Sequence, residues 1–135
     1  MTQTILVVDD EMHMRFFLNT LFKTSGYEVM VAKEGRDALV KARNKKPDLV
    51  ILDLMMHGEG GIPTYRQLKL DEQLRDIPVI ILSGVNSQAF AHSLKMLSLG
   101  LDHPLPEPEA FIEKPPDPRE LLQRVQNLLA GPINH

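Results

Sequence analysis

The stretch Ile5-Leu6-Val7-Val8-Asp9-Asp10-Glu11 decides the fold class of this chain. Its first four residues form a short apolar run rich in β-branched side chains, which is typical of a strand buried on both faces of a parallel sheet. Three acids follow at once, so the buried run ends there. Apolar residues then recur at helical spacing as far as Gly26, a residue suited to the end of a helix. The stretch therefore opens a strand–helix unit.

The same alternation of strand and helix recurs along the chain. Further predicted strands are residues 28–32, 48–52, 77–82 and 110–113, and further helices are residues 36–45, 63–74, 87–99 and a last one capped by Asp117, with Pro118 in its first turn. Five such units imply right-handed crossovers and an open parallel sheet with helices on both faces. We predict an α/β, doubly wound fold whose five parallel strands have the flavodoxin-like order 2-1-3-4-5.

Length and composition fit one soluble domain. The 135 residues are 43% hydrophobic and 24% charged, and the chain has no cysteine, which excludes disulfides and cysteine-based metal sites. The net charge of −3 argues against a phosphate-tracking surface. The apolar runs are far shorter than the roughly 20 residues of a membrane span. We expect a cytoplasmic protein with no direct nucleic-acid partner and no membrane insertion.

Residues 101–109 differ from the rest of the chain in composition. They contain three prolines and three acids, Asp102, Glu107 and Glu109. Proline prevents a helix here, so we expect a solvated surface loop between the fourth helix and the fifth strand. Since no linker is long enough to separate two domains, we predict one domain over residues 1–135 that carries this insertion.

Acidic residues lie at the carboxyl ends of two predicted strands. The first strand ends in Asp9 and Asp10, and the third ends in Asp53. In the predicted order these strands are neighbours, so the three carboxylates should meet at the edge where such sheets bind ligands. Like charges this close raise one another's pKa unless a cation offsets them. Ligands that are all oxygen predict Mg²⁺ or Mn²⁺ rather than zinc.

A hydroxyl and an ammonium group lie at two more strand ends. Ser83 ends the fourth strand and Lys114 follows the fifth. Taken singly, Asp10 or Glu11 could cap the first helix, Ser83 could cap the fourth helix, and Lys114 could be an ordinary surface lysine. Taken together, these residues match what phosphoryl transfer requires: a carboxylate nucleophile, a metal, and groups that hold phosphoryl oxygens.

Four motifs resemble the receiver domain of two-component response regulators. They are residues 7–11, 47–54, 78–84 and 111–115, in the family's order, and the resemblance covers nearly the whole chain. It implies a phosphorylatable signalling switch that accepts a phosphoryl group from a histidine kinase or phosphotransfer protein and acts on a downstream protein. Such a domain catalyses only its own phosphorylation and dephosphorylation. Sequence alone leaves the cognate kinase and the downstream protein open, and we expect a monomer or a weak homodimer.

The resemblance also implies roles for single residues around the acids. It makes Asp53 the phosphoacceptor. Asp10, Asp53 and the backbone carbonyl of Met55 would bind Mg²⁺ or Mn²⁺ directly, and Asp9 would help through water.

Ser83 and Lys114 would then contact the phosphoryl oxygens, and Ser83 and Phe111 would form the switch. The Lys114–Pro115 bond resembles the family's cis peptide. Phe111 has no hydroxyl, so its switch must depend on packing. We expect signalling on the side formed by the fourth helix, the fifth strand and the fifth helix.

Other departures and alternatives stay open. His57 stands where the family commonly has proline, and it is expected to be exposed. A small-molecule phosphotransferase or phosphohydrolase that forms an aspartyl-phosphate would want a second aspartate at position 55, which is Met55. A non-phosphorylated pseudo-receiver would not need the complete set of site residues. A nucleotide-binding domain would want glycines after the first strand. Sequence does not decide whether the chain stands alone or is a fragment of a longer regulator.

Overall fold

The computed structural model describes residues 2–56 and 60–130, and strand and helix alternate through them as predicted. The predicted exposure of His57 lies outside the described residues. The strands are β1 (Thr4–Val8), β2 (Glu28–Ala32), β3 (Leu49–Asp53), β4 (Val79–Ser83) and β5 (Ala110–Glu113). The helices are α1 (Met12–Thr24), α2 (Gly35–Asn44), α3 (Gly61–Leu70), α4 (Ser87–Leu97) and α5 (Pro118–Leu129).

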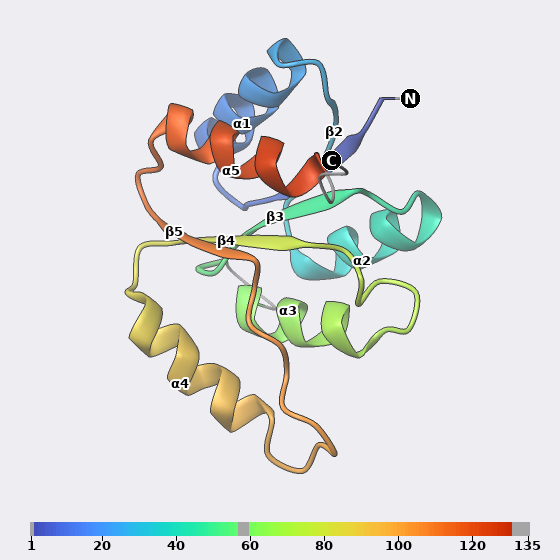
Figure 1. Ribbon diagram of the computed structural model, residues 1–135, viewed down its shortest axis with the longest axis vertical. Coiled ribbons are helices and arrows are strands. Elements are labelled where there is room, and N and C mark those ends of the chain that lie inside the picture. The colour runs from blue at the N-terminus through green and yellow to red at the C-terminus, as the bar shows by residue number, and fades with distance from the viewer. Residues whose placement is uncertain (1, 57–59, 131–135) are drawn as a thin grey trace, which may run out of the picture.

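The five strands form one parallel sheet in the order β2-β1-β3-β4-β5. Figure 1 shows α1 and α5 on one face of the sheet and α2, α3 and α4 on the other. The predicted doubly wound α/β fold is confirmed. Val8 pairs with Leu52, and Asp53 pairs with Leu82. This register brings the carboxyl ends of β1, β3 and β4 to one edge.

Each central strand divides its side chains between two apolar layers. In β1, Ile5 and Val7 pack with α1 and α5, whereas Leu6 and Val8 pack with the helices of the other face. All five residues of β1 are buried. Because both faces of the sheet are covered, the strands are continuous apolar runs, and the polar residues are displaced to the strand ends.

The structure moves several predicted boundaries by a few residues. Helix α3 ends at Leu70, four residues before the predicted end, because the Asp71 carboxylate accepts a hydrogen bond from the backbone N–H of Gln73 at 2.8 Å and starts a turn. Such local side-chain bonds compete with the helical ladder. Strand β4 begins at Val79 rather than at residue 77, after Pro78, which has no N–H for a sheet ladder.

Residues 101–109, hereafter the strap, are only in part the solvated loop that composition predicts. Most of the strap is exposed. Leu105, however, is 8% exposed and packs into the core of the α2–α4 face, and its N–H donates to Ser98 Oγ at 2.9 Å. One apolar side chain in the middle of the segment therefore ties it to the domain.

The strap is also attached on either side of Leu105. The Tyr65 hydroxyl of α3 donates to the carbonyl of Pro106 at 2.5 Å. At the end of the strap, Glu109 Oε1 accepts from the backbone N–H of Val79 at 2.7 Å. In Figure 1 the segment passes beside α3 and α4 before it enters β5. The strap is thus a fixed part of the α3–α4 face.

Candidate functional site

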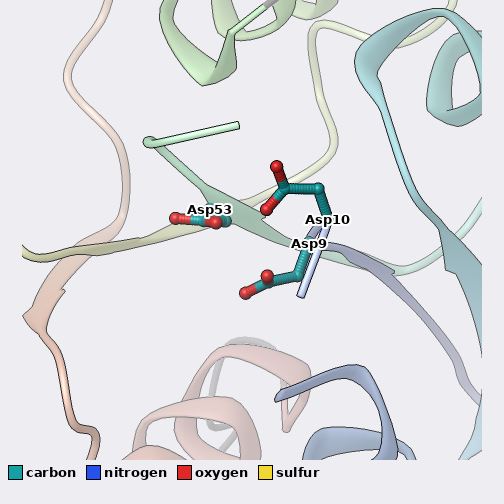
Figure 2. A group of neighbouring side chains, drawn as sticks. All are labelled: Asp9, Asp10 and Asp53. Carbon is teal, nitrogen blue, oxygen red and sulfur yellow. The ribbon is translucent and has the colours of Figure 1, made fainter. Parts of the chain in front are cut away.

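Three carboxylates meet at the carboxyl edge of the sheet. Asp9 and Asp10 follow β1, Asp53 ends β3, and one oxygen of each lies within 4.8 Å of the others. Figure 2 shows these three side chains close together at the ends of the two strands. Asp9 is 1% exposed and Asp53 is 2% exposed, whereas Asp10 is half-buried. The sheet brings the acids together as the strand order predicts.

A tight turn holds the end of β1. Asp9 Oδ1 accepts from the N–H of Glu11 at 2.9 Å, and the Glu11 carboxylate in turn accepts from the N–H groups of His13 and Met14. Glu11, rather than Asp10, is therefore the N-cap of α1. Arg15, which sequence reasoning missed, donates from Nη1 to the Asp9 carbonyl at 2.8 Å. These bonds fix Asp9 by both its side chain and its backbone.

Lys114 bridges two of the carboxylates. Its Nζ lies 3.2 Å from Asp9 Oδ2 and 3.1 Å from Asp53 Oδ1. The backbone N–H of Lys114 donates to the Ser83 carbonyl at 2.8 Å, and the Lys114–Pro115 peptide is cis. With its side chain 24% exposed and paired twice, Lys114 is not an ordinary surface lysine.

The site carries excess negative charge even with Lys114 in place. Burial and the neighbouring charge of Asp9 raise the pKa of Asp53 to about 6, against the opposing effects of the Met55 N–H and Lys114. Burial by itself would lower the pKa of Lys114, but hydrogen bonds and charges from Asp53 and Asp9 raise it. One ammonium beside three carboxylates leaves room for a divalent cation. The oxygen donors fit Mg²⁺ or Mn²⁺, whose preferred ligands are of this kind.

Ser83 lies at the same edge, at the end of β4. It is fully buried, and its Oγ accepts from the N–H of Val85 at 2.9 Å. Helix α4 is capped by Asn86 and not by Ser83, so the capping explanation for Ser83 is wrong. Because Oγ acts as an acceptor in that bond, its own hydrogen can be donated elsewhere.

Phe111 lies in β5, away from the carboxylates. It pairs with Ile81 of β4 and packs at a tilt against Phe90 of α4, with 5.6 Å between ring centroids. Of the two expected switch residues, Ser83 therefore lies at the strand ends beside the acids, whereas Phe111 lies further along β5. Met55 follows Asp53, and its N–H donates to Asp53 Oδ1 at 3.1 Å while its side chain is 61% exposed.

Gly61 is a further site residue that sequence reasoning missed. A Cβ on Gly61 would lie 2.3 Å from the carbonyl oxygen of Asp53 and 2.6 Å from Leu54 Cα. Only glycine allows α3 to begin this close to the end of β3. The Gly60–Gly61 pair is visible in the sequence, but adjacent glycines permit tight turns in general and do not by themselves show a close approach to Asp53.

Exposed apolar side chains lie next to the acids in the sequence. Met12 is 65% exposed and Phe16 is 72% exposed, both on α1 just after Asp9 and Asp10. Exposed Met55 follows Asp53. Large apolar groups exposed next to a polar site are a feature of protein-binding surfaces. Among the described residues, no helix is both long enough and apolar enough to cross a membrane.

Comparisons with known proteins agree with this geometry. Residues 5–126 match the model of the response regulator receiver domain family. The chain is 35% identical over 127 residues to the phosphate regulon transcriptional regulatory protein PhoB of Pseudomonas aeruginosa, which covers 94% of this chain and 52% of PhoB. It is 31% identical over 127 residues to protein PilH of the same organism, covering 94% of this chain and 98% of PilH.

The solved structures give the same result. The chemotaxis protein CheY4 of Vibrio cholerae superimposes with a TM-score of 0.81 at 25% identity, covering 95% of this chain and 99% of CheY4. The chain spans about half the length of several curated relatives that it matches, including PhoB. Family match, curated relatives and fold agree, and this chain belongs to the response regulator receiver domain family of two-component signalling systems.

Proposed function

We propose that this receiver domain is a phosphorylatable switch and that Asp53 is its phosphoacceptor. The donor is a histidine kinase or a phosphotransfer protein. One observation carries the proposal: Asp53 is buried beside Asp9 and Asp10 and is bonded to Lys114, so a single carboxylate lies within reach of both metal-binding oxygens and an ammonium.

The contacts of Asp53 favour one of its oxygens as the nucleophile. Lys114 Nζ and the Met55 N–H both contact Oδ1. This leaves Oδ2 as the preferred attacking atom. It forms the new bond to phosphorus while the phosphorus–nitrogen bond of the donor phosphohistidine breaks, and the imidazole leaves with that electron pair. A raised pKa does not prevent the attack, because above about pH 6 the Asp53 carboxylate is ionised.

Two protein groups and a metal would hold the phosphoryl oxygens. Asp9, Asp10, Asp53 and the Met55 carbonyl would hold Mg²⁺ or Mn²⁺, which when bound neutralises carboxylate and phosphoryl charge. Lys114 would exchange part of its contact with Asp53 for a phosphoryl oxygen, and Ser83 would donate its hydroxyl hydrogen to another. Both movements pull on backbone that leads into α4 and β5.

The switch would reach the surface by packing at Phe111. Ser83 and Phe111 lie two residues apart in register, since Ile81 pairs with Phe111. A shift of Ser83 toward the phosphoryl group therefore changes the strand that supports the ring. We propose that the side formed by α4, β5 and α5 carries the signal to a downstream protein, and that the exposed Met12, Phe16 and Met55 help to dock the phosphodonor.

Residues 1–135 are proposed to act as a single receiver domain that carries the strap. The expected cytoplasmic location, the monomeric or weakly dimeric state, and the lack of a direct nucleic-acid partner remain predictions from sequence.

Intact mass after incubation with acetyl phosphate tests the proposal. The wild type with Mg²⁺ or Mn²⁺ should gain one phosphoryl group, and Asp53→Asn should gain none. EDTA should abolish the gain in the wild type. A phosphate that persists in Asp53→Asn, or that forms equally well in EDTA, would overturn the assignment. A wild type that never gains mass and never binds the cation would favour a pseudo-receiver, whereas catalytic turnover of small phosphate esters would favour a phosphohydrolase.

A further inference from the structure

A line of aromatic side chains connects the strap to Phe111. The Tyr65 ring of α3 packs edge-on against Phe90 of α4, with centroids 5.8 Å apart and an interplanar angle of 75°. Phe90 in turn packs against Phe111 of β5 at 5.6 Å. The Tyr65 hydroxyl extends the line to the strap through its bond to the Pro106 carbonyl. The strap is thereby joined to Phe111 through two intervening side chains, Tyr65 and Phe90.

The members of this line are tightly enclosed. Tyr65 is fully buried and Phe90 is 4% exposed. Burial, with the charges of Glu109 and Glu107, raises the pKa of Tyr65, so its hydroxyl stays protonated and available as a donor. In a close-packed interior a ring that moves must displace its neighbours. A displacement of the strap would therefore displace Phe90 and, through it, Phe111.

The composition of the strap explains why it depends on side-chain partners. Pro104, Pro106 and Pro108 have no backbone N–H, so alternate positions cannot donate to a sheet ladder. Between the backbone bonds of Leu101 and Glu109 at its two ends, the strap is held by bonds to the side chains of Ser98 and Tyr65, and the Glu109 carboxylate adds a further bond. The Tyr65 bond joins the strap to the aromatic line by a hydrogen bond.

The strap and α4 enclose a groove that is lined by two of these rings, Phe90 and Phe111. Its volume is about 320 Å³, and its lining includes Phe90 and Leu94 of the α4 side, Glu107 and Pro108 of the strap, and Phe111. The position of the strap therefore shapes the surface around Phe111 as well as its packing. This surface belongs to the proposed signalling side.

We propose that Tyr65 is a positioning residue, which holds the strap at Pro106 and thereby restrains Phe90 and Phe111 in the arrangement described. Its significance for signalling rests on the proposed function, in which Phe111 is part of the switch. Loss of one neutral buried hydrogen bond changes a two-state equilibrium by about fivefold. Because the bond belongs to the arrangement described, Tyr65→Phe should weaken the preference for this arrangement, over one in which Pro106 has moved away, by up to about that factor.

The test compares two hydroxyl deletions in unphosphorylated protein with EDTA. Tyr65→Phe removes the hydroxyl and keeps the ring. Tyr27→Phe is the matched control, because Tyr27 packs edge-on against Phe22 in the apolar layer of the opposite face. Backbone amide and ring resonances of Phe111 report its arrangement by NMR. We expect large shifts at Phe111 and at residues 105–107 in Tyr65→Phe, and little change there in Tyr27→Phe.

A second variant tests the route of the effect. Phe90→Leu breaks the aromatic line and leaves the Tyr65–Pro106 bond. If the strap acts through Phe90, adding Tyr65→Phe to Phe90→Leu should add almost nothing at Phe111, while the strap resonances still shift. Thermal unfolding of each variant shows whether the fold as a whole has changed.

Two results would overturn the proposal. One is a Phe111 shift in Tyr65→Phe no larger than in Tyr27→Phe. The other is full additivity of Tyr65→Phe and Phe90→Leu at Phe111. Because no phosphoryl group is used, failure of the acetyl phosphate experiment would refute the proposed function without affecting this result. If the proposed function and the role of Tyr65 are both correct, phosphorylation of the wild type should shift the Phe111 resonances in the same direction as Tyr65→Phe does.

Discussion

The two ends of β5 are held in different ways. At the carboxyl end, Lys114 pairs with Asp9 and Asp53, so charged side chains meet at the edge of the sheet. At the amino end, the strap is held by a buried leucine, by bonds between backbone groups and side chains, and by the Glu109 N–H, which donates to the Val79 carbonyl. An ammonium pairs with carboxylates at the first end, whereas a buried leucine and hydrogen bonds to the backbone act at the second.

Within the four residues of β5, the proposed phosphorylation chemistry is thus at one end and the packing of the strap is at the other. Phe111, the second residue of β5, lies between the two ends. In the two proposals above, a change of charge at Asp53 would reach Phe111 from one side through Lys114, and a change of packing would reach it from the other through Phe90. Variants at the carboxyl end should therefore alter phosphorylation or its consequences, whereas variants at the amino end should alter stability and the Phe111 environment while phosphorylation continues.

The largest effect is expected from Lys114→Ala. The variant should still gain phosphate from acetyl phosphate, since Asp53 and the metal-binding oxygens remain, but phosphorylation should no longer shift the Phe111 resonances. In the proposed switch, the ammonium group links the new phosphoryl oxygen to β5. Lys23→Ala, at an exposed lysine in the last turn of α1, is the charge-matched control. A full wild-type shift in phosphorylated Lys114→Ala would show that the two ends of β5 are not coupled in this way.

The next effect is on stability and concerns the strap. Leu105→Ala should lower the free energy of unfolding by about 2–3 kcal/mol, because it removes a buried side chain and leaves a cavity. The yield of phosphorylation at Asp53 should not change. Leu99→Ala, at a leucine 73% exposed, should change stability by less than about 0.5 kcal/mol. Urea unfolding measures the free energy of unfolding of both variants. Equal decreases in Leu105→Ala and Leu99→Ala would mean that the strap does not contribute to the core.

A substitution at Gly61, which packs against the backbone of Asp53, should lower the free energy of unfolding by a similar or somewhat smaller amount. Gly61→Ala should cost about 1–3 kcal/mol and displace Asp53, because the added Cβ overlaps the end of β3. Gly84→Ala is the matched control, since among the described residues no atom lies within 4 Å of a Cβ built there. The phosphorylation rate should fall in Gly61→Ala only. Equal rates and stabilities in the two variants would contradict the role given to the close approach.

The smallest effect is the pH dependence of Asp53 without metal. The pKa of Asp53 is raised from 3.8 to about 6 in the folded protein, so the folded state binds more protons than the unfolded state between these values. The free energy of unfolding therefore falls as pH rises from about 4 to 6. In EDTA, Asp53→Asn should be more stable than the wild type by about 1–2 kcal/mol at pH 7.5, and this gain should vanish below pH 4. A gain that is the same at both pH values would mean that it does not arise from ionisation of Asp53.

Much of the fold and of the acidic edge follows from local patterns. The run from Ile5 to Val8 is apolar because β1 is covered on both faces, and the acids begin where that cover ends. Strand order then brings Asp9, Asp10 and Asp53 together. These features can be predicted because the strands are recognised from local periods and ends, and the regular alternation of strand and helix implies the strand order.

Other features were decided only by how the elements pack. Lys114, which follows β5, pairs with carboxylates at the ends of two other strands. Gly61 is required because the backbone of Asp53 lies against it. The Tyr65 hydroxyl of α3 donates to a carbonyl 41 positions later in the chain. The proline-rich composition of the strap predicted exposure, and it could not show that Leu105 is buried. Such contacts join residues distant in sequence, and no local period records them. They form only when the hydrophobic effect packs the layers closely together. The close packing then determines which side chains and backbone groups come into contact.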